Sequence, residues 1–309
     1  MGIKSFFVRP STEAFYKEAN KVPGFSWFDR IHSYVYGRWT YLYIGIGTGQ
    51  HPIAKKWAPV IGFLSQGMKK ETQGENRSMA DEYHGKAIPL GTATKLVMIN
   101  EPVNIPDLEQ VIPYKRARAL ILHNPDHIVA LDCPCRSARE NPCLPLDVCL
   151  VVGEPFASFV SDHHPDKTRW ITQEEAVAIL KAEDERGHVH HAFFKEAMLG
   201  RFYAICNCCS CCCGAMHAHQ NGTPMLASSG FVAQVDEDLC ISCGTCETYC
   251  QFEALTFDGV AVVDESKCMG CGVCVSKCSG EALSLRLEES RGIPLELDKL
   301  MDQASQARA

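Results

Sequence analysis

The chain has 309 residues, 18 of them cysteine, and a formal net charge of −7. This length supports two or three domains with hydrophobic cores, so the fold does not need disulfides to compensate for small size. The first residues lack the apolar run of a secretory signal, and no apolar run approaches the roughly 20 residues that span a bilayer. We therefore expect a cytoplasmic protein whose cysteines are metal ligands or redox groups.

Residues 1–90 form an N-terminal segment that we expect to be helical or irregular. Residues 1–56 carry eight Lys and Arg against three Asp and Glu, whereas the rest of the chain is acidic. The acidic body excludes nucleic acid as a partner, because phosphate binding needs a clustered basic surface. Residues 25–43 hold eight aromatic side chains. Their poor amphipathic periodicity favours docking to a partner subunit, or shielding of the cysteines, over a peripheral membrane contact.

A glycine-rich stretch follows the aromatic residues. Gly45, Gly47 and Gly49 come after the strand-like residues 41–44. The spacing does not fit a dinucleotide-binding G-x-G-x-x-G pattern, and no P-loop lysine follows. We therefore expect a flexible loop here and assign no flavin or NAD.

Residues 91–230 read as an α/β module rich in cysteine. The pattern predicts a helix over residues 114–124, a buried strand over 128–133 and a second strand over 147–153. Thr172 followed by Glu175 forms a capping box, which predicts a helix that starts there and ends at Gly187. The two strands would deliver cysteines at or near their ends to a common site.

Ten cysteines lie in this module, in two clumps. Cys206, Cys209 and Cys212 repeat the C-x2-C-x2-C spacing that wraps an iron-sulfur cubane. A fourth ligand has to come from the earlier clump, Cys133, Cys135, Cys143 and Cys149. Neighbouring cysteines diverge, so Cys208, Cys211 and Cys213 would face another site or stay free. We expect one or two additional iron-sulfur clusters, with ligands from Cys133, Cys135, Cys143, Cys149, Cys206, Cys208, Cys209 and Cys212. Disulfides, or a zinc or copper store, are the alternatives.

Charged and imidazole side chains surround the cysteines. Arg136 and Arg139 follow Cys135 closely, where they would either tune thiolates or form ordinary surface ion pairs. Histidines gather at 163–164 and 188–191, and most such histidines are structural rather than ligating. His217 and His219 are the pair better placed to donate hydrogen bonds near a cluster.

The C-terminal part contains an internal repeat of 28 residues, 235–257 against 263–285, in which every cysteine keeps its register. Each copy reads C-x2-C-x2-C-x3-C. Three thiolates on a tight loop embrace one cluster, and the fourth serves the other cluster. Zinc in two four-cysteine sites is the alternative, but zinc ribbons prefer paired C-x2-C knuckles.

On these motifs, residues 235–286 resemble a bacterial-type ferredoxin domain with two 4Fe-4S clusters. The resemblance implies one cluster on Cys240, Cys243, Cys246 and Cys278, and another on Cys268, Cys271, Cys274 and Cys250. The proline usual after the fourth cysteine is Gln251 in the first copy and Ser279 in the second. We expect residues 234–239 to pair with 255–264, and residues 262–267 to pair with 283–287.

Residues 102–230 are similar to cysteine-rich modules fused to ferredoxin domains in iron-sulfur proteins of anaerobic microbes. The stretches that carry this similarity are 111–136, the strand around Cys149, and the helix that leads to residues 205–213. The resemblance implies an architecture without an activity.

Together these patterns predict an α+β protein with four parts: the N-terminal segment 1–90, the cysteine-rich module 91–230, a two-cluster ferredoxin-like domain 231–288 and a tail 289–309. The expected function is relay of single electrons between the two ferredoxin clusters and at least one further cluster. The partner would be a redox protein or an oxidoreductase subunit. An oxidoreductase with a catalytic cluster or dithiol in the module, and a metal store or cluster-assembly scaffold, are the alternatives.

Overall fold

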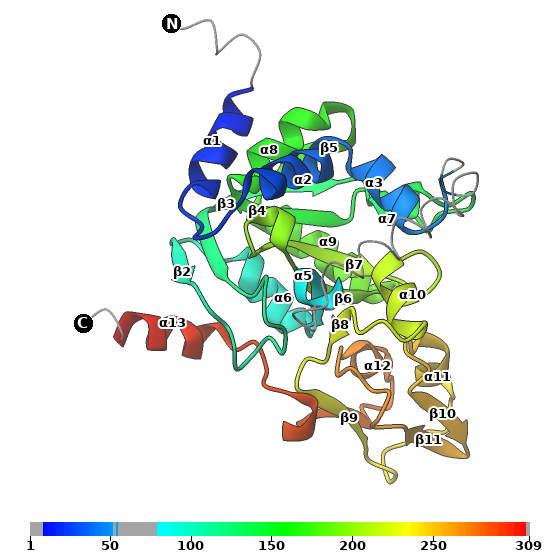
Figure 1. The fold of residues 1–309 in the computed structure, drawn as a ribbon. Helices are drawn as coiled ribbons and strands as arrows, with labels where there is room; N and C mark the ends of the chain where they lie inside the picture. Colours follow the sequence, from blue (N-terminus) through cyan, green and yellow to red (C-terminus); the bar gives the residue numbers. More distant parts are fainter. Residues whose placement is uncertain (1–8, 52–53, 55–78, 307–309) are drawn as a thin grey trace, which may run out of the picture.

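The computed structural model describes residues 9–51, 54 and 79–306. It has an α+β fold, in which a large sheet with helices on both faces carries a small C-terminal domain beside one end (Figure 1). Part of the expected N-terminal segment lies outside the described residues. Among the described residues, no helix combines the length and the apolarity that crossing a membrane requires.

The large sheet has eight strands in the order β2-β3-β4-β7-β6-β1-β8, with β5 paired to β3. All pairs are antiparallel except β1 with β8. We call this part the sheet domain. Its strands are β1 Tyr83–Ala87, β2 Val103–Ile105, β3 Leu120–Leu131, β4 Cys149–Glu154, β5 Thr168–Ile171, β6 Val189–Lys195, β7 Arg201–Cys208 and β8 Leu226–Ala227.

Two hydrophobic cores form on opposite faces of this sheet, because successive side chains of a strand point to opposite sides. On β4, Cys149 and Val151 enter one core, and Leu150 and Val152 enter the other. The first core is covered by helices from the N-terminal segment and by α8; the second is covered by α6, α9 and α13 (Figure 1). These helices are α1 Pro10–Ala19, α2 Trp27–Arg38, α3 Thr40–Gly47, α6 Leu90–Val97, α8 Phe156–His163, α9 Gln173–Glu185 and α13 Leu297–Gln306.

Shorter helical elements join the strands. They are α5 Met79–Glu82, α7 Pro134–Ser137, α10 Gly214–Gln220, and the 3₁₀ turns η2 Pro165–Lys167, η3 Glu196–Met198 and η4 Glu289–Arg291. The capping box that starts α9 is confirmed: the Thr172 hydroxyl accepts from the Glu175 N–H, and the Glu175 carboxylate accepts from the Thr172 N–H.

The C-terminal domain, residues 231–288, contains β9 Phe231–Val235, α11 Thr245–Tyr249, β10 Leu255–Asp258, β11 Val260–Val263, α12 Val273–Lys277 and β12 Leu283–Leu287. Its strand pairing differs from the expected one, since β10 pairs with β11 and β9 pairs with β12. Gly259, with φ +74°, closes β10 onto its immediate neighbour. This tight local turn leaves the first and last strands to pair with each other.

Two other expected elements are wrong. Residues 114–124 do not form a helix: Ala117 and Asn124 have positive φ, and β3 begins at Leu120. Pairing with β2 and β4 there overrides a helical pattern. Residues 41–44 are helical within α3 rather than strand-like, and Gly45 and Gly47 belong to that helix rather than to a loop.

The boundaries of the parts also shift. Strand β1 lies inside the expected N-terminal segment, yet it pairs with β6 in the middle of the sheet. The tail is not separate either, because Leu295 and Leu297 are buried in the second core.

Candidate functional site

Eight cysteines of the C-terminal domain surround two small cavities. Each cavity is lined by three cysteines of one repeat and the fourth cysteine of the other. One cavity is lined by Cys240, Cys243, Cys246 and Cys278. The other is lined by Cys250, Cys268, Cys271 and Cys274.

The backbone around these cavities supplies N–H donors and close approaches. The Ala254 N–H donates to the Cys250 sulfur over 3.2 Å, and the Ala282 N–H donates to the Cys278 sulfur over 3.3 Å. Gly270 has φ +61°, and a Cβ there would lie 2.1 Å from the Phe231 carbonyl oxygen. Four thiols, N–H donors and a backbone cradle fit the requirements of a 4Fe-4S cluster.

The ten remaining cysteines form two groups. We call the first the outer thiol group; its four sulfurs all lie within 4.8 Å of one another. The Cys143 sulfur lies 3.1 Å from that of Cys211 and 3.7 Å from that of Cys209, and the sulfurs of Cys211 and Cys212 are 3.6 Å apart. Cys211 is exposed and Cys143 is half-buried, whereas Cys209 and Cys212 are buried, so one side of this group reaches the surface.

The other six cysteines form the inner thiol group. They line a cavity of about 60 Å³, whose wall also includes Cys209 and Cys212 of the outer group. Hydrogen bonds link their thiols in series, and the sulfurs of Cys208 and Cys213 are 3.2 Å apart. Backbone N–H groups of Arg136, Gly214 and Met216 donate to three of these thiols. Other backbone N–H groups do the same for the cysteines of the C-terminal domain. The members are Cys133, Cys135, Cys149, Cys206, Cys208 and Cys213.

Strand geometry explains this division. Cys149 of β4 lies directly opposite Cys206 of β7, and Cys208 shares the same face of β7 two residues later. The chain leaves the sheet only after Cys208, so Cys209 already points to the outer group. Both Cys212 and Cys213 line the inner cavity, but the Cys212 sulfur belongs to the outer set, whereas the Cys213 sulfur lies beside that of Cys208.

The expected set of Cys206, Cys209 and Cys212 lines the inner cavity together, but only Cys209 and Cys212 belong to the close set of outer sulfurs. Extended β7 keeps Cys206 beside Cys149 and away from the turn. Of the earlier clump, only Cys143 joins Cys209 and Cys212, and Cys211 completes that set. Cys133, Cys135 and Cys149 instead meet Cys206 in the inner group.

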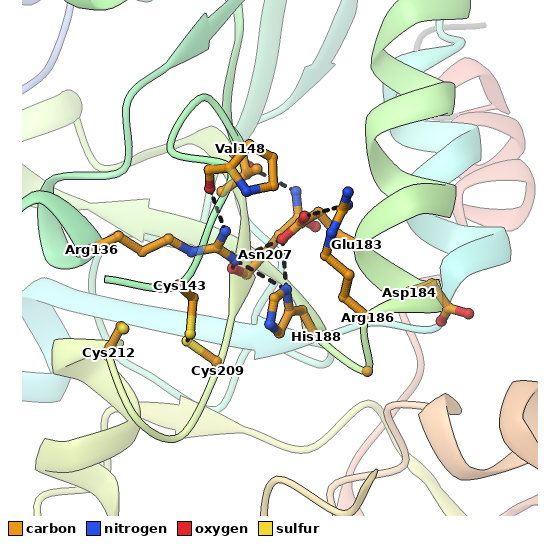
Figure 2. A network of polar contacts seen from close by, with 12 residues as sticks. Arg136, Cys143, Val148, Glu183, Asp184, Arg186, His188, Asn207, Cys209 and Cys212 are labelled. Atoms are coloured by element: carbon orange, nitrogen blue, oxygen red, sulfur yellow. Dashed lines mark hydrogen bonds and ion pairs between the residues drawn. The ribbon is translucent and has the colours of Figure 1, made fainter. Parts of the chain in front are cut away.

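A buried polar network holds the inner group together (Figure 2). The Arg136 guanidinium donates to the carbonyl of Pro145 over 2.6 Å and to that of Asn207, between Cys206 and Cys208, over 3.1 Å. It also pairs with the Glu183 carboxylate at 2.6 Å, and both side chains are only 1% exposed. Arg136 thus fixes three cysteine-bearing segments and is not a surface ion pair.

The protonation of these groups follows from their surroundings. Burial would raise the pKa of Glu183, but hydrogen bonding by His188 and the charge of Arg136 lower it below the usual value. A hydrogen bond to Cys135, together with burial, raises the pKa of Cys133 to about 12. The hydrogen bond with Cys213 lowers the pKa of Cys208, but burial raises it to about 12. Such thiols deprotonate only when a cation compensates their charge, which metal binding does.

The N-terminal helices cover the inner group. Tyr36 and Thr40 line its cavity, and the hydroxyls of Tyr36 and Tyr203 lie 2.8 Å apart. Tyr41 donates to the carbonyl of Asp132 over 2.7 Å, just before Cys133. The many aromatic residues of 25–43 indicate from the sequence that this segment shields the cysteines. Nothing in the sequence around Tyr203 of β7 indicates that it also lies beside them.

One hydrogen-bonded bridge joins the two domains at the cysteines. The Gln251 side-chain oxygen accepts from the Ser210 N–H over 2.8 Å, and its amide nitrogen donates to the Gly187 carbonyl over 3.0 Å. Gln251 directly follows Cys250, while Ser210 lies between Cys209 and Cys211. The sequence singles out Gln251 only as a departure from proline.

The histidines do not join the thiol groups as ligands in the part of the chain that the structure describes. His163 forms a hydrogen bond with the hydroxyl of Thr12, and His164 forms one with the carbonyl of Gly37. His188 forms a hydrogen bond with the Glu183 carboxylate, and His190 forms one with the Asn207 side chain. Arg139 donates to the carbonyl of Cys212 over 3.1 Å and approaches the His217 ring at 3.5 Å.

Comparison with known proteins bears on the C-terminal domain. Residues 233–256 and 261–284 each match the 4Fe-4S binding domain family. No curated protein matches the chain. Residues 233–284 are therefore a 4Fe-4S binding region with two adjacent motifs, and the cysteines of the sheet domain lie outside the matched residues.

Proposed function

We propose that this protein is an iron-sulfur electron-transfer protein, in which the C-terminal domain exchanges single electrons with an iron-sulfur centre on the inner thiol group. Bound 4Fe-4S clusters supply one-electron redox chemistry. The observation that carries the proposal is the bridge through Gln251. It links the residue after Cys250 to the loop that bears Cys209 and Cys211.

The donor set of the inner group supports an iron-sulfur centre there. It offers six thiols, more than the four that a cubane takes, around one cavity that Cys209 and Cys212 also line. Three backbone N–H groups point at these thiols, as in the C-terminal domain. The cover of Tyr36 and Thr40 would exclude water from the centre, which is the shielding role expected for the N-terminal segment.

The two sites of the C-terminal domain face different surroundings. Cys243 is exposed, so the site that contains it is accessible to a redox partner protein. The site with Cys250 and Cys268 faces the sheet domain, where the Ser229 hydroxyl donates to the Gly270 carbonyl over 2.8 Å. We therefore place electron entry at the Cys243 site and transfer to the sheet domain at the Cys250 site.

An oxidoreductase is the second candidate, and the Tyr36–Tyr203 pair favours it. Both hydroxyls lie in the wall of the inner cavity or beside it, and burial raises the pKa of each above its usual value. Protonated hydroxyls beside a redox centre are suited to hold a proton for reduction of a small substrate. If this candidate holds, cyanide or carbon monoxide should perturb the spectrum of the inner centre.

Electron paramagnetic resonance of the full chain, purified anaerobically and reduced stepwise, tests the relay. We expect signals from more centres than the two of the C-terminal domain. Cys149→Ser combined with Cys206→Ser should remove only the additional signal, and Ser210→Ala, which keeps the bridging N–H, should remove none. If the unmutated chain shows signals from the two clusters of the C-terminal domain and no others, the relay is refuted.

Gln251→Ala tests the route. It removes both side-chain hydrogen bonds of the bridge, each worth about 1 kcal/mol. In stopped-flow reduction we expect slower appearance of the inner-centre signal, with unchanged reduction of the C-terminal clusters. An unchanged rate for the inner centre would contradict transfer through this contact.

A further inference from the structure

We propose that the outer thiol group binds one metal ion, Zn²⁺ or iron, in tetrahedral thiolate coordination, at a site separate from the iron-sulfur centre proposed for the inner group. The ligands are Cys143, Cys209, Cys211 and Cys212. The site does not depend on the proposed electron relay, because its ligands differ from those of the inner centre.

Sulfur spacing is the first argument. A tetrahedron with Zn–S bonds of about 2.3 Å has S···S edges of about 3.8 Å. The contacts of 3.1, 3.6 and 3.7 Å, with all pairs within 4.8 Å, match one ion with four thiolates. In a cubane each thiolate binds a different iron at a corner, so the four sulfurs lie farther apart.

The rest of the molecule provides an internal comparison. In the described part of the chain, the outer group is the one set of three or more ligating side chains drawn together closely enough to share an ion. The eight cysteines of the 4Fe-4S region form no such set, and they surround cavities instead. The six inner thiols also surround a cavity. Cys209 and Cys212 also line that inner cavity, so the close spacing of its four sulfurs is what distinguishes the outer group from both sets of cluster-type cysteines.

The positions of the ligands indicate what the ion does. Cys143 lies in the irregular segment between α7 and β4, and Cys211 lies 68 residues later in the turn after β7. Four thiolates complete the coordination of the ion and leave no open position, as in structural zinc sites. The ion would thus clamp the two segments together and stabilise the fold.

Neighbouring groups support an anionic centre. Four thiolates around a divalent ion carry two net negative charges. Arg139 donates to the carbonyl of Cys212 through Nη2 at 3.1 Å, which brings a guanidinium beside the ligands. Ser210, within the ligand turn, donates its N–H to Gln251. By fixing this turn, the ion would position the surface that receives the C-terminal domain.

A disulfide between Cys143 and Cys211 is the competing interpretation. Their sulfurs lie 3.1 Å apart, well beyond the roughly 2.05 Å of an S–S bond. Cys209 and Cys212 also point into the same space, and Figure 2 shows Cys143, Cys209 and Cys212 together beside Arg136. A tetrahedral ion binds four thiolates, whereas a disulfide joins only two sulfurs, so the two additional thiols are accounted for by an ion and not by a disulfide.

Metal and acid-labile sulfide analysis of the anaerobically purified full chain tests the site, because a single ion adds metal without sulfide. We expect about one zinc per chain, or about one iron in excess of sulfide. X-ray absorption at the zinc edge should show four sulfurs at about 2.3 Å. If the excess metal is iron, Mössbauer spectroscopy should show a mononuclear high-spin site. Metal and sulfide in equal amounts, without zinc, would overturn the proposal, and so would an intact Cys143–Cys211 disulfide.

Variants assign the ligands. Cys143→Ser and Cys211→Ser should each lower the metal content by about one ion and leave sulfide unchanged. The matched control is Ser210→Ala, which lies between the ligands Cys209 and Cys211 and should lose neither metal nor sulfide. Equal loss of metal and sulfide would mean a cluster, and no loss would mean no site. The spectrum of the inner centre is recorded on the same samples, so failure of either proposal is seen separately.

Discussion

Replacement of Glu183 by Gln removes the charge that compensates the buried Arg136. The Arg136 and Glu183 side chains are each 1% exposed and 2.6 Å apart. Removing one partner of a buried ion pair costs about 3–5 kcal/mol, because the other charge stays buried without compensation. At roughly 2 °C per kcal/mol for a chain of this size, Glu183→Gln should lower the melting temperature by about 6–10 °C.

Thermal unfolding followed by circular dichroism under anaerobic conditions measures this effect. The matched control is Glu296→Gln, which breaks the exposed pair with Lys299, whose side chain is 70% exposed. Exposed pairs contribute about 0–1 kcal/mol, so the control should shift the melting temperature by no more than about 2 °C. Equal shifts in the two variants would refute the view that a buried charge pair holds the cysteine-bearing segments together.

Three further substitutions test particular positions. Gly187 has φ +79°, and Gly187→Ala places a Cβ 2.4 Å from the Tyr249 ring. We expect the contact between the two domains to lose about 1–3 kcal/mol of stability, which hydrogen exchange should show as weaker protection of the amides at that contact. Gly270→Ala, with its Cβ 2.1 Å from the Phe231 oxygen, should lower the iron content, whereas unchanged iron would contradict the close approach. Burial lowers the pKa of His191 to about 3, so unfolded chains bind a proton at higher pH than folded ones, and stability falls as pH drops from about 6.5. His191→Phe should flatten this dependence of melting temperature between pH 7 and 5, and an equally steep curve would refute it.

Features set by local sequence could be predicted. The C-x2-C-x2-C-x3-C repeats place their cysteines around two cavities because three of the four ligands lie on one short loop. The capping box at Thr172 and the strand that ends before Cys133 also follow from neighbouring residues. In each case the residue pattern that gives the prediction lies within one short stretch of the chain.

Features set by distant contacts could not be predicted. The spacing of Cys206, Cys209 and Cys212 favours one cluster, but β7 remains extended through Cys208 because it pairs with β4 and β6. That long-range pairing divides the cysteines between two groups. For Arg136 the sequence likewise leaves open a role beside the thiolates or a surface ion pair, and the contact with Glu183 of α9 decides between them. A single sequence holds no record of these contacts.

Iron and acid-labile sulfide per chain, measured on the anaerobically purified full-length protein, test most directly whether the sheet domain holds an iron-sulfur centre. Two 4Fe-4S clusters account for about 8 iron and 8 sulfide, and a four-iron inner centre raises the sulfide to about 12. We predict about 12 sulfide per chain. A value of about 8, with the inner thiols free to react with iodoacetamide after mild unfolding, would contradict the account.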